Sequence, residues 1–461
     1  MVSGGMSFPS PGAVTRIARL SMLALLLAFA AARPAAAQTA LRDSETELLF
    51  RDISAPLIAA ARLDKGTNVV LLNDPEINAF VAGGQTVYVQ SGLLLASDNV
   101  NQLQGVIAHE LGHVAGGHVI RMQSGQDEAQ GISIATMVLG VLAMAAGAGD
   151  AGMGIMMAGQ RAALGRFLAF TRTQEASADS AGAKYLAAAG VSGKGSIEFF
   201  KTLQNQEFRL AVVAKDSYDR THPLSSERIA ALLNVYEKDP AWTRPPDPAL
   251  EARFQRVKGK LLGFTNPKLA TSRYPESDKS VPAHYARAYA YHVGAYPQKA
   301  LSEAETLLKT NPDDPFFLEL KGQILLESGK PAEAIAPLRE AAARAGDQPL
   351  IASMLGHALI STDRPENFVE AKQVLKAAVN RDNQNPFAWY QLGIIYGREG
   401  DLPRAALATA ERNNLEGNPK QALASAEMAL KGIPAGSPDY LRAQDIAMVS
   451  RTELKKKKRD R

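Results

Sequence analysis

The chain has 461 residues, 46% of them hydrophobic and 21% charged, which is the balance of a globular protein and excludes a wholly disordered chain. It contains no cysteine, so disulfides, cysteine-ligated metals and thiol nucleophiles are excluded, and any metal site must use His, Asp and Glu. The net charge of +4 comes from the two ends, because the first 37 residues hold three arginines and no acid, and the last seven hold six bases and one acid. The body between them carries an excess of acids, so we predict no nucleic-acid partner.

The first 37 residues have the features of an export signal. Arg16 and Arg19 precede an apolar run from Leu20 to Ala32, and the alanines at 35–37 form a small-residue cleavage site. The run is short against the ~20 residues that a membrane-spanning helix needs. We therefore favour a cleavable Sec-type signal peptide at 1–37 over an uncleaved anchor, and predict a periplasmic location.

Residues 38–239 mix helix and strand signals and are predicted to form one α+β domain. The stretches 69–72 and 86–90 are rich in β-branched residues and predict strands. If the second strand forms a sheet edge beside the active site, an extended substrate can pair with its backbone; the alternative is an internal strand with no free edge. Four prolines between 240 and 248 then predict a boundary, with a connector reaching residue 281.

A second apolar run covers residues 132–146 and continues into a Gly- and Met-rich stretch that ends at residue 157. The run is short and contains Gly140, which argues against a membrane span. One alternative is a buried hairpin. The other is a mobile lid over the active site, adaptable through its methionines, that a substrate or peripheral contact with a membrane displaces.

Residues 282–452 are predicted to form an all-α tetratricopeptide solenoid. Prolines recur at intervals of 33, 34 and 37 residues, at positions 282, 315, 349 and 386, and a glycine stands seven residues after each of the last three. In the last unit, residues 389–396 match the W-x2-L-G-x2-Y pattern of these repeats. Such an array presents a concave surface to partner proteins. The basic tail at 453–461 is expected to be solvated and disordered.

The chemistry of the chain centres on the sequence His109-Glu110-Leu111-Gly112-His113. In a helix, residues four apart share a face, so His109 and His113 can bind one ion, and we predict a single Zn²⁺ per chain. Glu110 is about 100° around the helix from His109, which places its carboxylate beside the metal. A general base that deprotonates the attacking water must stand there.

The third metal ligand decides the subclass of the enzyme. His118 lies one residue before the position where metzincins carry their third histidine, and it could reach the ion only if the helix breaks at Gly116-Gly117. Otherwise the ligand must come from a later element. Glu175 and Asp179 are spaced i, i+4 downstream, so Glu175 could complete the shell while Asp179 accepts the second ring N–H of a zinc histidine. The alternative for both is an exposed helix carboxylate.

The motif at 109–113 and the segment Glu175-Ala-Ser-Ala-Asp179 together resemble the CaaX-prenyl-protease/HtpX group of zinc metallopeptidases. Residues 78–80 and 89–93 also resemble that group's substrate-side segment. The resemblance implies a zincin-type α+β domain with His109, His113 and Glu175 as zinc ligands and Glu110 as catalytic base.

An exported chain of this group with a C-terminal tetratricopeptide array resembles enzymes of outer-membrane quality control. The resemblance implies that unfolded or stalled outer-membrane β-barrel proteins are the substrates, and that the array contacts the β-barrel assembly machinery. The rival interpretation is a non-proteolytic chaperone or assembly adaptor with a latent zinc site.

A later segment, Thr221-His222-Pro223 followed by Glu227-Arg228, resembles the group's His-Pro segment. By that resemblance His222 lies over the zinc, either as a fourth ligand that keeps the enzyme latent or as a donor to the developing oxyanion. Arg228 is expected to anchor this loop or to stabilise charge in the transition state. The alternative is a loop histidine with an arginine ion pair.

Overall fold

The computed structural model describes residues 39–459 except 65, 146–147, 211–221, 223–225 and 347. The predicted signal peptide lies outside these residues. Residues Ala40–Arg461 form one compact unit. Within the described residues, every helix is too short or too polar to cross a membrane.

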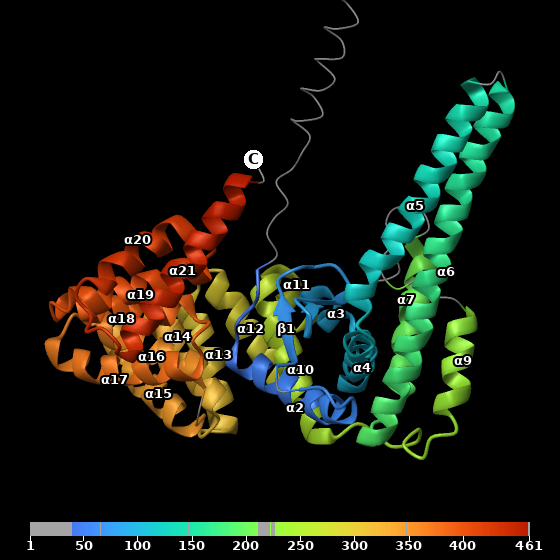
Figure 1. Cartoon of the computed structure of the whole chain (residues 1–461). Helices are drawn as coiled ribbons and strands as arrows, with labels where there is room; N and C mark the ends of the chain where they lie inside the picture. Colours follow the sequence, from blue (N-terminus) through green and yellow to red (C-terminus); the bar gives the residue numbers. More distant parts are fainter. Residues whose placement is uncertain are drawn as a thin grey trace, which may run out of the picture. The chain divides into compact units, whose positions relative to one another are not determined.

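The first part of this unit contains a three-stranded sheet between helices (Figure 1). The elements in chain order are α2 (Ser44–Ala60), β1 (Asn68–Leu72), β2 (Ala79–Ala82), β3 (Thr86–Gln90), α3 (Ser91–Ala96) and α4 (Val100–Gly116). The strands predicted at 69–72 and 86–90 are confirmed as β1 and β3, whereas β2 was not predicted.

The sheet has the order β1-β3-β2, with β3 parallel to β1 and antiparallel to β2. The expectation that residues 86–90 form a sheet edge is therefore wrong, because β3 is the central strand. The reason is the turn at Gly83 and Gly84, whose φ angles of 61° and 92° fold β2 back onto β3. β2 takes the edge position, and it packs on α4.

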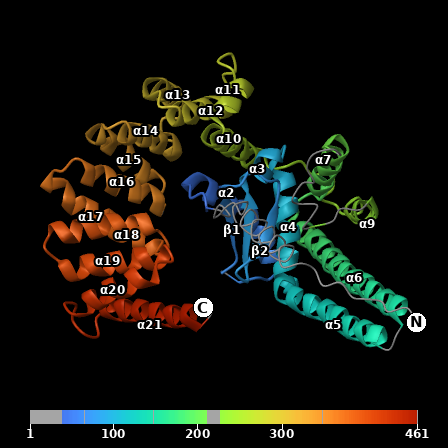
Figure 2. The ribbon, with the colours of Figure 1, turned by 90° about the horizontal axis from the view of Figure 1, so that it is seen from above.

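Two long antiparallel helices follow, α5 (His118–Ala145) and α6 (Gly149–Ala189), and they lie side by side in Figures 1 and 2. The interpretation of 132–146 as a buried hairpin is wrong, since Ile134, Leu139 and Leu142 are exposed. Among the described residues, α5 packs mainly against α6. After α6 come α7 (Lys194–Leu210) and α9 (Ser226–Tyr236).

The core of this first part surrounds α4. Every residue from Val100 to Val114 is buried, because α4 is covered by β2 and β3, by α2, and by α6 and α7. Leu103, Ile107 and Leu111 are fully buried among the apolar residues of α2 and the sheet. This complete burial makes α4 a rigid carrier for the histidines that it presents.

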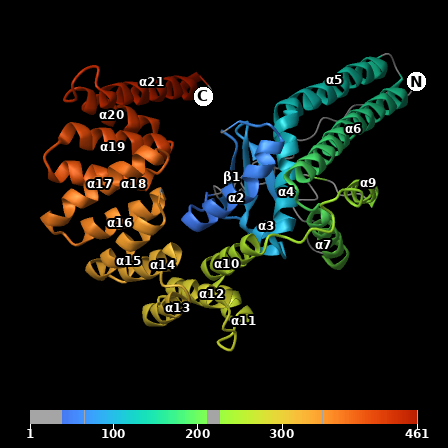
Figure 3. The ribbon, with the colours of Figure 1, turned by 90° about the horizontal axis from the view of Figure 1, so that it is seen from below.

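The remaining helices form a stacked array that Figures 2 and 3 show from opposite sides. Two helices lie in the predicted connector, and ten follow as antiparallel pairs. They are α10 (Pro248–Thr265), α11 (Pro267–Arg273), α12 (Val281–Val293), α13 (Pro297–Thr310), α14 (Pro315–Glu327), α15 (Pro331–Arg344), α16 (Pro349–Ser361), α17 (Pro365–Arg381), α18 (Pro386–Arg398), α19 (Leu402–Leu415), α20 (Pro419–Leu430) and α21 (Pro438–Arg459).

The periodic glycines lie where paired helices approach each other. A Cβ on Gly322 would lie 2.4 Å from Leu338 Cγ, and one on Gly356 would lie 2.6 Å from Leu375 Cγ. The repeat-forming prolines begin the first helix of each pair, where a missing N–H costs nothing. The expected disorder of the basic tail is wrong for residues 453–459, because α21 continues to Arg459.

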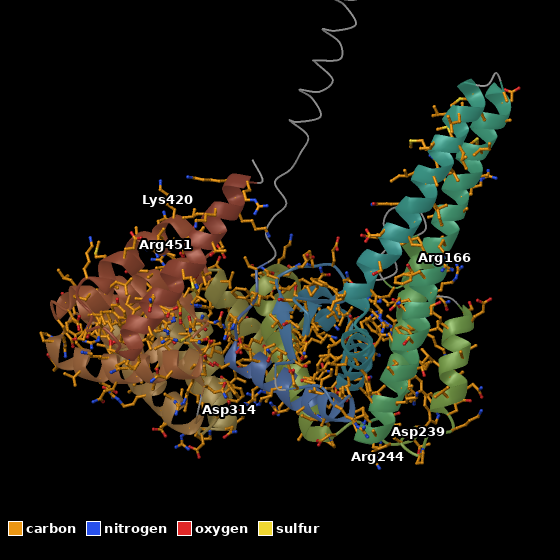
Figure 4. The ribbon with its side chains drawn as sticks, in the orientation of Figure 1. Arg166, Asp239, Arg244, Asp314, Lys420 and Arg451 are labelled. Carbon is orange, nitrogen blue, oxygen red and sulfur yellow. The ribbon has the colours of Figure 1, made fainter. Side chains whose placement is uncertain are left out.

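Helix α10 joins the sheet-containing part to the array through buried charges. Arg256 lies 2.7 Å from Glu45 of α2 and 2.8 Å from Asp314, the residue that caps α14 and is labelled in Figure 4. Lys260 on the next turn pairs with Asp43 at the start of α2. These ion pairs join α2 of the sheet-containing part to the first repeats.

Candidate metal centre

Helix α4 presents the two motif histidines on one face. Its first turn is capped by Asn99, whose side chain accepts a hydrogen bond from the backbone N–H of Gln102. The helix ends at Gly117, which has a φ of 62°, so the chain turns away directly after the motif. His109 and His113 lie one turn apart between these caps, with their Nε2 atoms 3.1 Å from each other.

Four buried side chains converge at these nitrogens. Glu175 comes from α6, with Oε2 3.4 Å from His109 Nε2 and Oε1 3.3 Å from His113 Nε2. His222 comes from the segment before α9, with Nδ1 3.3 Å from His109 Nε2 and 3.1 Å from Glu175 Oε1. One ligand atom from each of the four residues lies within 4.8 Å of every other.

The spacing of these atoms fits a tetrahedral metal shell. Zinc bonds to imidazole and carboxylate are about 2.0–2.1 Å long, so the ligand atoms of a tetrahedral site stand about 3.3 Å from one another. The distances that join His109 to His113 and to Glu175 are 3.1 and 3.4 Å, and that from His113 to Glu175 is 3.3 Å. A set of three imidazoles and one carboxylate, with no thiolate, suits zinc.

Glu110 stands beside this cluster. Its side chain is buried, and among the described residues neither carboxylate oxygen has a hydrogen-bond partner. His222 is an ionisable neighbour, with Nε2 3.5 Å from Glu110 Oε1. A buried carboxylate without a partner is costly to maintain, and such an arrangement is common where the group has to take and release a proton.

Asp179 and Arg228 support the cluster from behind. Asp179 Oδ1 lies 2.9 Å from His109 Nδ1, on the side of the ring that faces away from the cluster. Arg228 donates two hydrogen bonds to Asp179, of 2.8 and 2.9 Å, and its Nη2 lies 3.2 Å from Glu175 Oε2. Figure 1 shows α6 and α9, which carry these residues, beside each other.

The carboxylates around His109 change the pKa values of the site. Burial opposes ionisation of Glu175, but hydrogen bonds from the surrounding histidines hold the pKa of Glu175 well below its usual range. Burial also opposes protonation of His109, yet Asp179 and Glu175 raise the pKa of His109 to about 10. The site therefore attracts a positive charge, which a divalent cation supplies.

His118 is a neighbour of the site that the sequence indicated only as a near miss. The helix does break at Gly117, but the ring of His118 turns to His113, with the two Nδ1 atoms 3.0 Å apart. This nitrogen of His113 faces away from the cluster, and His118 is not part of the four-residue group. The motif spacing ruled His118 out as a ligand on an unbroken helix; it gave no sign of this contact.

Helices α4 and α6 approach each other closely beside the cluster. A Cβ on Gly112 would lie 2.7 Å from the carbonyl oxygen of Ala178, and one on Gly182 would lie 3.1 Å from the carbonyl carbon of Ala108. The small residues let α6 bring Glu175 within reach of the histidines on α4. The glycine inside the motif was the available signal for this approach.

The structure brings the expected site residues together. His109, His113, Glu175 and His222 form the cluster, and Glu110 is beside it. Asp179 contacts His109, the zinc histidine expected as its partner, and Arg228 contacts Asp179 and Glu175. Thr221 and Pro223 of the His-Pro segment lie outside the described residues.

Comparisons with known proteins agree with this geometry. Residues 43–235 match the model of peptidase family M48. The chain is 27% identical over 383 residues to the β-barrel assembly-enhancing protease of Yersinia pestis, and the alignment covers 81% of this chain and 76% of that protein. The protein of the same name from Escherichia coli K12 is 28% identical over 381 residues, 80% of this chain and 75% of that one. Metalloprotease LoiP of Escherichia coli K12 is 33% identical over 158 residues, 33% of this chain and 56% of that one.

Proposed function

We propose that this chain, which carries a peptidase family M48 domain followed by a helical repeat region, is a zinc-dependent endopeptidase of the periplasm. The observation that carries the proposal is the buried cluster of four metal-binding side chains with Glu110 beside it. In this proposal His109, His113 and Glu175 hold one zinc ion, and the domains divide as the sequence predicts, at 38–239 and 282–452.

Each protein group around the ion has its own role in peptide hydrolysis. Held by His109, His113 and Glu175, zinc would supply a Lewis acid for the scissile carbonyl and would lower the pKa of a water molecule toward ~7. Glu110 takes the proton from the attacking water and then gives it to the leaving amine. Asp179 holds His109 with its Nε2 turned to the metal, and Arg228 fixes the carboxylate of Asp179.

His222 decides whether the site is open. A catalytic zinc site keeps one coordination position free, whereas four protein ligands close it. His222 Nδ1 lies at hydrogen-bond distance from both His109 and Glu175, which is where a fourth ligand belongs. We assign His222 the role of a latch: with the ion bound, its ring would fill the fourth position, and once a substrate displaced it, the ring would donate to the oxyanion.

The edge strand β2 offers a binding mode for the substrate. Residues Ala79–Ala82 pair with β3 on one side only and pack against α4, which carries the motif. An extended peptide that adds to this edge is held through its backbone, so that the enzyme accepts many sequences. Such tolerance suits unfolded or stalled outer-membrane β-barrel proteins, the substrate class that we propose from the names of the relatives.

We propose that the helical repeats bind the substrate or the machinery that assembles it. Their stacked helix pairs give an extended surface of the kind that binds partner proteins, and the β-barrel assembly machinery is the partner that we propose. A cavity of about 690 Å³ lies between the start of α2, α10 and the repeats, lined by Arg42, Lys260, Met354 and Phe387 among others. Its mixed apolar and charged lining is suited to a polypeptide segment.

The decisive experiment is digestion of an unfolded β-barrel protein by the purified chain without residues 1–37. We expect the wild type to cleave slowly, His222→Ala to cleave faster, and both activities to disappear with a chelator. Glu110→Gln should retain zinc and lose cleavage. Unchanged turnover by Glu110→Gln would refute the proposed base.

The closed fourth position also favours a second candidate, a non-proteolytic chaperone or assembly adaptor with a latent zinc site. The two candidate functions can be distinguished by complementation of cells that lack the protein. Rescue of barrel assembly by Glu110→Gln to the wild-type level would support the adaptor, and failure of that variant would support the peptidase.

A further inference from the structure

The largest unexplained feature of the described surface is the apolar outer half of the α5–α6 hairpin. Of the 27 exposed large hydrophobic residues in the described part of the chain, ten lie between residues 134 and 157. They are Ile134, Met137, Val138, Leu139, Val141, Leu142, Met144, Met153, Ile155 and Met157. We call this region, the described residues 130–145 and 148–160, the hairpin tip.

The apolar surface surrounds the hairpin tip instead of forming a stripe. Met137, Val138 and Leu139 are consecutive, so their side chains point in directions about 100° apart on α5, and all three are exposed. On the side that faces α6, Gly140 lets the two helices approach closely, because a Cβ there would lie 2.3 Å from Met156 Cγ and 2.8 Å from the carbonyl oxygen of Gly152. A groove on a protein partner covers one face of a helix, whereas lipid covers all of them.

Charged residues flank the hairpin tip on both α5 and α6. Between Glu128 and Arg161 the sequence holds a single charged residue, Asp150. Asp150 stands in the first turn of α6, where the helix N-terminus stabilises a carboxylate. Below the tip, Arg166 of α6 lies 2.9 Å from Glu128 of α5, and Figure 4 shows Arg166 on the hairpin. Arg161 adds a positive charge at the boundary, as suits anionic headgroups.

The length of the hairpin tip matches part of a bilayer. Sixteen residues of α5, from Gln130 to Ala145, span about 24 Å, less than the ~30 Å of the hydrocarbon core. Each leg is therefore too short to span the core, and the hairpin can enter the bilayer from one side and return. This agrees with the finding that, in the described residues, no helix is suited to cross a membrane.

We propose that the hairpin tip inserts into the surface of a phospholipid bilayer and holds the protein at a membrane. The apolar side chains enter the headgroup and acyl boundary, and Arg161 and Arg166 stay among the headgroups. Because α6 also carries Glu175, about 21 Å along the helix from Arg161, such an anchor would hold the metal centre close to the membrane surface. The proposal stands apart from the peptidase assignment, since binding to lipid needs no catalysis.

The test is flotation of the purified chain, without the apolar residues 1–37, on vesicles of phosphatidylethanolamine and phosphatidylglycerol. We expect the wild type to float with the vesicles. The double variant Leu142→Asp/Met153→Asp should bind at least about tenfold more weakly. The control is Met428→Asp in α20, because Met428 is 61% exposed and Leu142 is 60% exposed, and this variant should float like the wild type.

Circular dichroism and zinc content should be the same in all variants, so that loss of flotation is not loss of fold. A wild type that stays unbound would overturn the proposal, as would flotation that the tip substitutions leave unchanged. If the wild type stays unbound and the double variant instead loses binding to an unfolded barrel protein, the tip is a protein-docking surface. If the wild type self-associates without lipid and the double variant is monomeric, the tip is an interface between copies.

Discussion

Replacing Gly112 by alanine tests whether the close approach of α4 and α6 sets the metal site. The added Cβ would lie 2.7 Å from the carbonyl oxygen and 2.8 Å from the Cα of Ala178, and both are backbone atoms that cannot rotate away. Ordinary contact begins at 3.4 Å, so the two helices must separate by about 0.7 Å at this point. Functional metal sites tolerate about ±0.2 Å in their ligand distances.

The size of the effect follows from this separation. Overpacking of a buried contact costs about 1–3 kcal/mol. Zinc must draw Glu175 back toward the histidines against that cost, which weakens its binding by roughly 10- to 100-fold. The fold itself should survive, because the strain is confined to one crossing point.

Zinc affinity should be measured by competition with a chromophoric chelator. The matched control is Gly165→Ala, a helical glycine on α6 with nothing within 4 Å of its added Cβ. This control should bind zinc normally and be more stable by up to about 1 kcal/mol, because alanine favours helix. Wild-type affinity in a folded Gly112→Ala variant would refute the idea that this approach positions the ligands.

Three further predictions concern other parts of the chain. His118→Ala should weaken zinc binding about tenfold in the same competition assay, because His113 loses the ring that contacts its Nδ1, and unchanged affinity would make that contact incidental. Burial, together with Asp43 and Glu45, raises the pKa of Glu319 to about 8 against the opposing Lys260, so this carboxyl stays protonated in the fold and ionises near 4.5 when unfolded. The free energy of unfolding should therefore fall between about pH 4.5 and 8 by up to about 1.4 kcal/mol per pH unit. Measured by denaturant unfolding at a series of pH values, the free energy of unfolding of Glu319→Gln should depend less on pH than that of the wild type. In the array, Gly356→Ala should cost about 1–3 kcal/mol in thermal unfolding, whereas Gly393→Ala, with its nearest contact at 3.4 Å, should be neutral or stabilising; equal effects would contradict the packing argument.

The sequence predicted most reliably what depends on local periodicity. The spacing of His109 and His113 required one helical face, and the 33- to 37-residue period placed the first helix of each repeat pair at its proline. The strands β1 and β3 were recognisable from their β-branched residues. These features are properties of neighbouring residues and need no knowledge of the tertiary fold.

What the sequence did not predict depends on contacts between distant segments. The edge position of β2 results from a turn at two glycines, and the central position of β3 from pairing on both sides. The contact of His118 with His113 required the direction of the chain after Gly117. The exposure of Ile134, Leu139 and Leu142 could not be predicted, because an apolar run looks the same whether other helices cover it or solvent and lipid surround it.

The measurement that tests the central claim most directly is the zinc content of the purified chain, with its coordination read by X-ray absorption. We predict one zinc per chain, bound by nitrogen and oxygen at about 2.0–2.1 Å, with three imidazoles in the wild type and two in His222→Ala. His113→Ala should lose the metal. Full zinc occupancy in His113→Ala, or a wild type that binds none, would contradict the assignment of this cluster.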